Sequence, residues 1–513
     1  MAKITLSGFM GSGKTKIGKI LSKKLNIPHF DLDDEIEKRE NMKINEIFEN
    51  YGEKYFRDVE KKTLNEILDK KEDFILSLGG GSILDEESLN RVIMESVPIL
   101  LNGDIGVFYD RIKKDNKRPL LSSFDDFKNL YKKREKIYEK IPIKIRSDRD
   151  EDLIVRNIIS LFKRYQFEAP HKISIELALS HKFKNEIPFS ILDKRVFELY
   201  KKRLRIKNFY LIKNGERSKN LKEYFKIINF LSNLKFEKND PLYIIGGGVS
   251  GDIGGFVAST YMRGVDFYLI PTTLISQIDS SIGGKNGLNL SYGKNLVGTI
   301  YLPKEVFIDP SFLFTLNKRE IISGLGEIFK YSILNKNGIF DLLELNEKID
   351  FLEIISLIIK SIKEKIFWIK DDILDKKEKR IYLNLGHTTG HILETLLGYG
   401  KISHGEAVAF GIIFSSFISL RENLMKESIF DRIFKIYKKL GFNYKKILKI
   451  KNLKDFQIYD ALLVDKKSKN KKLNLIIPLD IGEVKILKDF EIKNYIKYLK
   501  EFILNLEELW KEF

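Results

Sequence analysis

The sequence predicts an α/β protein of two or three domains built around parallel β-sheets. Its 513 residues, 43% of them hydrophobic, are more than one ordinary hydrophobic core holds together. Two apolar strands, near residues 4–7 and 242–245, each end in a glycine-rich turn that is followed by a helical pattern. A third region, residues 384–420, has helical periodicity and carries three of the six histidines.

The composition limits where the protein works and which metal ligands it offers. Cysteine is absent, which excludes disulfides and thiolate metal sites and leaves histidine and carboxylate side chains as ligands. The chain begins with a strand rather than with a basic and apolar export signal. The longest apolar stretch, residues 407–420, contains serines and is too short to span a membrane. We therefore expect a cytoplasmic protein with no membrane partner.

The formal net charge is +18. Two explanations compete: binding to nucleic acid, or a lysine-rich surface combined with phosphate-bearing substrates. The lysines are spread among glutamates rather than gathered in a stripe with interleaved aromatic residues, which favours a solvated surface. No nucleic-acid partner is expected. A basic nucleic-acid-binding ATPase is the alternative, and nucleic acid would then stimulate its ATP turnover.

The first glycine-rich turn, residues 8–15, is a P-loop in its required context between a strand and the helical pattern of residues 17–25. The backbone N–H groups of such a turn surround phosphates, while Lys14 reaches the β and γ oxygens and Thr15 ligates magnesium. The sequence therefore predicts a site for ATP and Mg²⁺. The expected ATP-binding residues are Gly11, Ser12, Gly13, Lys14 and Thr15.

Several acidic and basic residues follow the P-loop, each on or beside a predicted strand or helix. Asp31 and Asp33 alternate along a segment that we expect to be extended, so that both face the P-loop. Arg57 lies near the start of a helix, and the strand at residues 74–78 empties into a glycine triplet that contains Gly80. Further on, Arg118 lies in a polar segment and Arg134 on a predicted helix, residues 131–140.

These motifs resemble shikimate kinase, a P-loop kinase, over residues 1–167. The resemblance implies that Asp33, Arg57, Gly80 and Arg134 bind shikimate, and that Asp33 also orients or deprotonates the accepting hydroxyl. Asp31 would support magnesium, and Arg118 would neutralise charge on the transferred phosphoryl group. Another small-molecule or nucleotide kinase is the alternative, against which the acid-binding set argues.

The second glycine-rich turn follows the buried strand at residues 242–245. Gly246, Gly248 and Gly251 satisfy G-x-G-x-x-G, with Gly247 between them, and a helical pattern follows on which a dinucleotide pyrophosphate can rest. Taken alone this motif is weak. No acidic residue stands at a second strand end twenty positions further on, so the unit is not a standard Rossmann motif.

The histidine stretch suggests a metal centre. His387 and His391 are spaced i, i+4 and leave one face of a helix, while His404 opens the next apolar helix. Two imidazoles from separate segments and a carboxylate from elsewhere make a three-ligand zinc site with an open position. Hydrogen-bonded core histidines are the alternative, and which of the three are ligands stays open at this level.

Further stretches lie in a specific order: 271–274, 277–285, 293–298 and 324–330, then the histidines. In that order they resemble 3-dehydroquinate synthase over about residues 170–505. The resemblance implies a Rossmann-like NAD-binding α/β part at 168–310 and a mainly α-helical metal-binding part at 311–513. The whole chain then resembles a fusion of two enzymes of one pathway.

The synthase resemblance also implies roles for particular residues. Glu327 would join His387 and His404 as a ligand of Zn²⁺ or Co²⁺, and His391 would contact substrate instead. The residues expected to bind NAD are Asp193, Glu216, Lys219, Gly246, Gly247, Gly248, Gly251, Asp252, Thr272, Thr273 and Lys294. Those expected to bind substrate are Arg263, Asp279, Lys285, Asn295, Lys365, Arg380, Asn384, His391, Lys466 and Lys467, with Lys285, Arg380 and His391 also catalytic.

The implied reaction converts 3-deoxy-D-arabino-heptulosonate 7-phosphate to 3-dehydroquinate and phosphate, with NAD as a transient oxidant. One departure is the segment before Arg380, where an apparent one-residue insertion leaves the family's glutamate without a clear counterpart. The resemblance also implies a homodimer through the synthase part. A metal-dependent polyol or glycerol-phosphate dehydrogenase is the alternative; it would release NADH, and the Lys285, Lys294 and Asn295 set argues against it.

Overall fold

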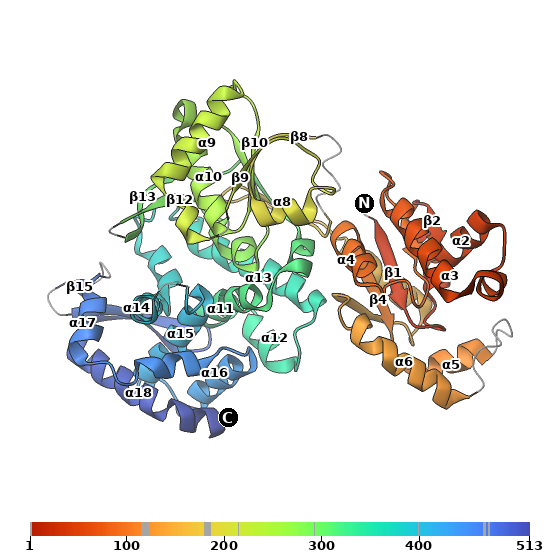
Figure 1. Cartoon of the computed structure of the whole chain (residues 1–513). Helices are drawn as coiled ribbons and strands as arrows, with labels where there is room; N and C mark the ends of the chain where they lie inside the picture. The colour runs from red at the N-terminus through yellow and green to blue at the C-terminus, as the bar shows by residue number, and fades with distance from the viewer. Residues whose placement is uncertain are drawn as a thin grey trace.

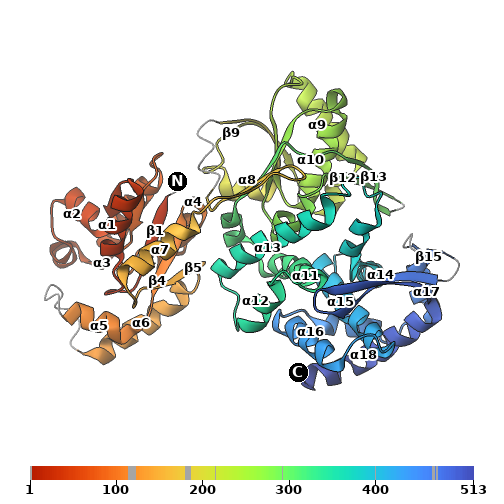
Figure 2. The same cartoon turned by 180° about the vertical axis from the view of Figure 1, so that it is seen from behind.

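The computed structural model describes residues 3–113, 123–178, 186–213, 215–291, 293–398, 400–464, 468–469 and 472–512. The first 160 or so residues form a lobe beside a larger one that holds the rest of the chain (Figures 1 and 2). The predicted α/β class with parallel sheets and a helical C-terminal region is confirmed. No helix among the described residues combines the length and apolarity that a membrane crossing needs.

The first lobe is a parallel five-stranded sheet between helices. Its strand order is β2-β3-β1-β4-β5, which places β1, the strand before the P-loop, in the centre. The strands are β1 Ile4–Gly8, β2 His29–Asp31, β3 Ile75–Ser77, β4 Val97–Asn102 and β5 Ile143–Arg146. The helices are α1 Lys14–Leu25, α2 Leu32–Glu40, α3 Ile44–Leu68, α4 Glu86–Glu95, α5 Ile105–Lys113, α6 Phe124–Tyr138 and α7 Glu151–Leu161.

One local prediction in this lobe is wrong. Asp33 was expected on an extended segment with Asp31, but the strand ends at Asp31 and Asp33 lies in the first turn of α2. The reason is helix capping. The Asp31 carboxylate accepts a hydrogen bond from the backbone N–H of Asp33, so α2 begins at Leu32, directly after the last residue of the strand.

The second lobe contains a seven-stranded sheet of order β6-β7-β14-β11-β10-β8-β9, parallel except for β6. The predicted boundary between residues 167 and 168 falls in the connection between β6 and β7, which pair with each other. The strands are β6 Tyr165–Phe167, β7 Lys172–Ile175, β8 Ile187–Asp193, β9 Ile206–Ile212, β10 Leu242–Gly246, β11 Phe267–Pro271 and β14 Glu305–Ile308. Helices α8 Lys194–Tyr200, α9 Leu221–Asn233 and α10 Gly248–Thr260 accompany the sheet, and β12 Lys285–Leu290 pairs with β13 Gly293–Ile300 beside it.

The rest of the second lobe is mainly helical, as predicted, but it also contains an antiparallel three-stranded sheet that was not predicted. The helices are α11 Lys318–Leu334, α12 Ile339–Leu345, α13 Phe351–Ile369, α14 His387–Leu397, α15 His404–Arg421, α16 Glu427–Lys439, α17 Asp455–Val464 and α18 Ile492–Glu512. The strands are β15 Ser468–Lys469, β16 Lys472–Asp480 and β17 Glu483–Glu491.

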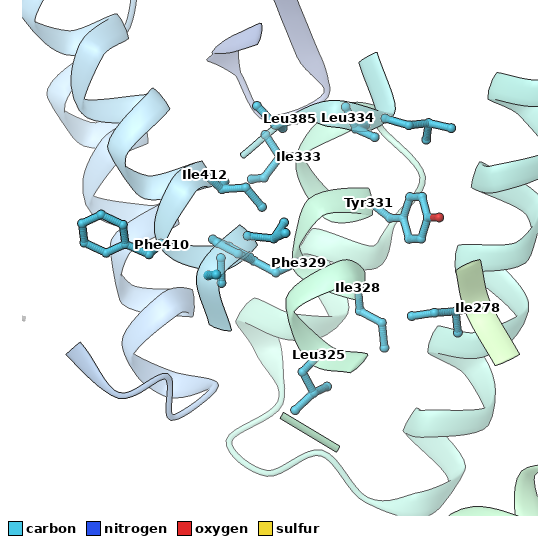
Figure 3. Close-up of a cluster of buried hydrophobic side chains, with 14 of the residues drawn as sticks. Ile278, Leu325, Ile328, Phe329, Tyr331, Ile333, Leu334, Leu385, Phe410 and Ile412 are labelled. Carbon is cyan, nitrogen blue, oxygen red and sulfur yellow. The ribbon is translucent and has the colours of Figure 1, made fainter. Parts of the chain in front are cut away.

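Helix α11 runs through the core of this part. Figure 3 shows its apolar side chains between Ile412 of α15 on one side and Ile278 of η4, Ser276–Ser280, on the other. Helix α15 is buried almost throughout, so its apolar stretch belongs to the core. A capping box starts α15: the Ser403 hydroxyl accepts from the Glu406 N–H, and the Glu406 carboxylate accepts from the Ser403 N–H.

Candidate functional site

The P-loop has the backbone that its sequence predicts. Gly11 and Gly13 have φ of +79° and +87°, which residues with a side chain rarely adopt, and α1 starts directly after them. The Thr15 hydroxyl donates to Asp31 Oδ2 at 2.6 Å, so the two expected magnesium-associated groups lie together. Lys14 Nζ donates to the carbonyl of Gly8 at 2.8 Å and stays within the loop. The turn therefore presents backbone N–H groups and one ammonium to the same space.

The predicted acid-binding residues of the first lobe converge on the glycine triplet after β3. A Cβ added at Gly79 would lie 2.8 Å from Asp33 Oδ1, one at Gly80 would lie 3.0 Å from Arg134 Nη1, and one at Gly81 would lie 2.7 Å from Arg57 Nη1. Because the triplet has no side chains, one carboxylate and two guanidinium groups lie close to its backbone. Arg118 lies outside the described residues.

Buried partners hold these arginines in place. Arg57 Nη1 donates to Glu60 at 2.7 Å, and the Ser82 hydroxyl donates to the other oxygen of Glu60 at 2.6 Å. Arg134 Nη1 donates to the Gly80 carbonyl at 3.0 Å. A guanidinium fixed in this way keeps its remaining N–H groups oriented for a carboxylate ligand.

In the second lobe, three helices bring Glu327, His387 and His404 together. Their ligand atoms lie within 4.8 Å of one another. Glu327 Oε1 is 3.6 Å from His387 Nε2 and 3.5 Å from His404 Nε2. His391, on the same face of α14, lies to the side, its ring centroid 6.3 Å from that of His404. Among the described residues, these three form the group that combines carboxylate and imidazole ligands for a metal.

Glycines next to each of the three residues allow this approach. A Cβ at Gly326 would lie 2.1 Å from the carbonyl oxygen of Gly405, so α11 and α15 touch backbone to backbone between Glu327 and His404. A Cβ at Gly386, which precedes His387, would lie 2.5 Å from the carbonyl oxygen of Val408. Any larger residue at these crossings would push the three helices apart and separate the ligand atoms.

The charge of this cluster suits a cation. Glu327 is 1% exposed, and within the described residues its Oε1 accepts no hydrogen bond. Burial disfavours its ionisation, yet the neighbouring Lys330 ammonium and the imidazoles hold the pKa of Glu327 below the ordinary value. A buried, ionised carboxylate oxygen that faces two imidazole nitrogens fits a divalent metal ion. The donor set fits Zn²⁺ or Co²⁺, since both accept nitrogen and oxygen ligands.

A cavity of about 1260 Å³ extends from His404 to the glycine-rich turn after β10. The predicted NAD-binding and substrate-binding residues that line it are Asp193, Glu216, Lys219, Gly247, Gly248, Asp252, Thr272, Thr273, Lys294, Asn295 and His391. Within it, the Lys219 ammonium donates to both Asp252 and Asn295 and so connects α10 to β13. Burial raises the pKa of Asp252 to about 6, although Lys219 opposes the shift. The cavity is large enough for a dinucleotide together with a sugar phosphate.

The predicted substrate residues Asp279, Lys365 and Arg380 are not among those that line this cavity. Lys365 Nζ is 2.7 Å from Asp279 Oδ1, and the Tyr331 hydroxyl donates to the same oxygen. Burial opposes ionisation of Asp279, but Lys365 and Lys330 hold the pKa of this carboxyl low. Arg380 packs against Gly283, where an added Cβ would lie 3.2 Å from Arg380 Nη2. Asp279, Lys365 and Tyr331 therefore form one polar cluster, while the Arg380 guanidinium donates to the carbonyl of Ile373 at 2.7 Å.

The remaining predicted residues are placed as follows. Asn384 ends the 3₁₀ helix η6, Glu378–Asn384, three residues before His387. Arg263 is exposed on η3, Tyr261–Arg263, and is not among the residues that line the cavity. Gly246 and Gly251 stand at the end of β10 and in the first turn of α10. Lys466 and Lys467 lie outside the described residues.

The structure adds three side chains that the sequence reasoning did not assign. Lys330 forms an ion pair with Glu327 from one turn further along α11, a position that i, i+3 spacing could have indicated. Asp375, with φ +57°, places its carboxylate 2.6 Å from Lys285 Nζ. It lies in the segment before Arg380, where the family's glutamate has no clear counterpart. Glu394 of α14 contacts His404 at 3.2 Å, which no spacing between separate helices predicts.

Comparison with known proteins agrees with both halves. The family model described as shikimate kinase matches residues 10–163, and the models for the N-terminal and C-terminal parts of 3-dehydroquinate synthase match residues 209–323 and 324–468. A 3-dehydroquinate synthase from Dictyoglomus turgidum is 37% identical over 351 residues, covering 66% of this chain and 96% of that protein.

Among solved structures, the synthase part has the fold of two other synthases. One is a 2-epi-5-epi-valiolone synthase from Streptomyces hygroscopicus subsp. jinggangensis with NAD⁺ and Zn²⁺ bound, with TM-score 0.59, 23% identity and coverage of 67% of this chain and 98% of that one. The other is a 2-deoxy-scyllo-inosose synthase complexed with carbaglucose-6-phosphate, NAD⁺ and Co²⁺, with TM-score 0.58, 24% identity and coverage of 66% and 99%. At these identities the likeness establishes the fold.

One relative has both halves in the same order. The bifunctional shikimate kinase/3-dehydroquinate synthase from Thermotoga maritima is 34% identical over 419 residues, covering 80% of this chain and 83% of that protein. The chain therefore belongs to the bifunctional shikimate kinase/3-dehydroquinate synthase family, and combines that family's two shikimate-pathway activities in one polypeptide.

Proposed function

We propose that each activity has its own site in the chain, residues 1–167 for the kinase and residues 168–513 for the synthase, the latter divided near residue 310. The observation that carries the synthase proposal is the buried Glu327 carboxylate, whose Oε1 lies 3.6 and 3.5 Å from the Nε2 atoms of His387 and His404 beside a cavity of about 1260 Å³. Zn²⁺ or Co²⁺ would be held by these three residues, and NAD by the glycine-rich turn.

In the synthase site, a bound metal would polarise a substrate hydroxyl. NAD would supply the transient oxidant, which takes up a hydride from the substrate and later gives it back. The protein's own residues bind and orient 3-deoxy-D-arabino-heptulosonate 7-phosphate. Lys285, Lys294 and Arg380 supply positive charge for its phosphate and carboxylate groups. Lys365 and Asp279 form an ion pair at 2.7 Å, and both are assigned to substrate binding in this part.

In the kinase site, the P-loop holds the ATP phosphates and Thr15 with Asp31 holds Mg²⁺. Arg57, Arg134 and the glycine triplet bind the shikimate carboxylate and hydroxyls, and Asp33 orients the hydroxyl that accepts the phosphoryl group. The distances from the triplet to these three side chains support this arrangement. Arg118 is assigned the phosphoryl-neutralising role on its sequence position alone.

We also propose a cytoplasmic homodimer formed through the synthase lobe. The apolar side chains of Phe225 on α9 and of Met262, next to Arg263, are exposed, and the Tyr224–Thr260 hydroxyl pair joins α9 to the end of α10. Exposed apolar side chains in this region support an interface. In such a dimer the exposed Arg263 would contribute its guanidinium to the substrate site of the neighbouring subunit. Light scattering of the full chain tests it: the mass should be twice 59.9 kDa.

The deciding experiment supplies the full chain with heptulosonate phosphate and far less NAD than substrate, and follows phosphate release and absorbance of NADH together. The expected result is many phosphates released per NAD with no accumulation of NADH. NADH formed in proportion to substrate would instead indicate a polyol-type dehydrogenase. In parallel, shikimate should be required for ADP formation from ATP, and added nucleic acid should leave that rate unchanged.

A further inference from the structure

Glu394 is a buried carboxylate that faces the metal cluster without belonging to it. It lies on α14, three residues after His391 and seven after His387, so all three side chains share one helix face. The residue is 8% exposed and lines the large cavity. A buried carboxylate at such a place requires partners, because burying an unpaired charge is costly.

The two oxygens of Glu394 face two different elements. Oε1 lies 3.2 Å from His404 Nδ1, at the start of α15. Oε2 lies 3.8 Å from Lys294 Nζ, which β13 brings from the dinucleotide side of the cavity. Glu394 is therefore the point where a predicted metal ligand and a predicted cofactor lysine meet.

The geometry around the two histidines explains what this contact does. His387 Nδ1 lies 3.1 Å from the backbone carbonyl of Leu385, so its outer partner is neutral, whereas the outer partner of His404 is a carboxylate. In both residues the outer partner is placed to accept a hydrogen bond from Nδ1–H, and in that tautomer the lone pair of Nε2 faces Glu327 Oε1. A carboxylate partner additionally makes the imidazole a stronger donor to a metal.

The charges lead to the same conclusion. Lys330 forms an ion pair with Glu327 Oε2 and so cancels part of the negative charge that the three ligands present. A divalent cation held by one partly neutralised carboxylate and two neutral imidazoles would be under-compensated in a buried site. Glu394, one imidazole away, supplies the missing negative charge without occupying a coordination position.

We propose that Glu394 is a positioning residue of the metal centre: it fixes the orientation and tautomer of His404 and, through Lys294, ties the metal ligands to the cofactor side of the cavity. The proposal rests on the proposed function, in which Glu327, His387 and His404 bind the metal. It adds that the affinity of the site depends on a carboxylate that contacts no metal.

The test measures Co²⁺ affinity directly. Full-length protein is stripped with a chelator and titrated with Co²⁺, with absorbance as the signal, for wild type, Glu394→Ala and Glu394→Gln. Glu394→Ala is expected to weaken Co²⁺ binding about 10- to 100-fold, the range found for outer partners of metal-bound histidines. Glu394→Gln should lie between, because its amide oxygen still accepts from Nδ1–H but carries no charge.

Glu406→Gln is the matched control. Glu406 is also buried and lies on the same helix as His404, two residues away, but it bonds to Ser403 and Lys446 instead. Glutamine retains the capping box, so this variant should bind Co²⁺ like wild type. The far-UV circular dichroism and the thermal unfolding of every variant report whether the synthase lobe is folded, and the shikimate kinase rate reports the state of the kinase lobe.

The outcomes separate the two hypotheses. Wild-type affinity in Glu394→Ala, with Co²⁺ binding lost in His387→Ala, would overturn the role of Glu394 and leave the metal centre standing. Equal Co²⁺ binding by wild type and His387→Ala would overturn the metal centre itself. Equal weakening by Glu394→Ala and Glu406→Gln would show that any buried carboxylate near α15 matters, which would also overturn the specific role.

Discussion

The two sites of this chain are assembled in opposite ways. In the kinase lobe, β1, β2 and β3 end at one edge of a parallel sheet, and Lys14, Asp33 and the glycine triplet follow those strands directly. In the synthase lobe, Glu327, His387 and His404 come from three helices that meet only because glycines allow backbone contact. The first site depends on strand order and short turns, and the second depends on how closely helices pack.

The two sites also differ in the burial of their charged groups. Arg57 in the kinase site is one-third exposed, whereas Glu327 and Lys330 in the synthase site are almost completely buried. A buried ionic cluster is strongly weakened when one partner is removed, because the other charge is left without compensation. The synthase site should therefore tolerate substitution less well than the kinase site, and this difference can be measured within one polypeptide.

The largest expected effect comes from His387→Ala. Loss of a proposed metal ligand should reduce synthase activity by more than the about 100-fold that loss of an outer partner costs, while shikimate kinase activity stays at the wild-type level. Both rates are measured on the same preparation. Wild-type protein that is stripped of metal with a chelator and then supplied with Mg²⁺ should likewise lose synthase activity and keep kinase activity. Synthase activity that survives both treatments would contradict the proposed metal centre.

Asp33→Asn tests the other half of the comparison. The amide retains hydrogen bonding but cannot take a proton, so the kinase kcat should fall about 100-fold, the lower end of the range for acid–base groups, with the synthase rate unchanged. A change confined to the KM for shikimate would mean that Asp33 only binds substrate. Asp34→Asn, its exposed neighbour one residue further along α2, is the control.

Gly326→Ala tests whether helix packing assembles the synthase site. The added methyl would lie 2.1 Å from the carbonyl oxygen of Gly405, a backbone atom that cannot move aside. We expect a loss of about 3 kcal/mol in unfolding free energy, the upper end for overpacking, together with weaker Co²⁺ binding. Gly251→Ala is the control for stability, because a methyl at that helical position meets no atom within 4 Å. Unchanged stability in Gly326→Ala would show that the helices can separate without cost.

His171, at the junction of the two lobes, should make stability depend on pH by a smaller amount. It is 6% exposed, neither ring nitrogen has a hydrogen-bond partner within the described residues, and burial lowers its pKa to about 4. Between that value and the ordinary pKa of 6.5, the unfolded chain binds a proton that the folded chain does not. Stability from this residue is therefore complete above the ordinary pKa and is lost as the pH falls towards about 4.

At pH 5 the loss attributable to His171 should be about 2 kcal/mol relative to pH 7. In His171→Leu the drop in unfolding free energy between pH 7 and pH 5 should be smaller by that amount, as measured by chemical denaturation at the two pH values. His29→Leu is the comparison, since His29 is only half-buried and bonds to Ser77. An identical pH dependence in wild type and His171→Leu would contradict the assignment.

By itself, the sequence determined the α/β class with parallel sheets, the P-loop and the glycine triplet. It could do so because these features are local: a strand, a turn and a helix start leave patterns within a few residues. The resemblance of ordered motifs then identified Glu327 as the partner of His387 and His404, which no local pattern indicates.

Only the tertiary structure decided which contacts surround those residues. Asp31 caps α2 and ends the strand early, Lys330 neutralises Glu327, Asp375 reaches Lys285, and Glu394 reaches His404 across two helices. The Asp31 cap and the Lys330 pair span only two and three residues, whereas the Asp375–Lys285 and Glu394–His404 contacts depend on distances between separate elements. Such distances are set by the packing of whole helices, and short-range periodicity carries no information about them.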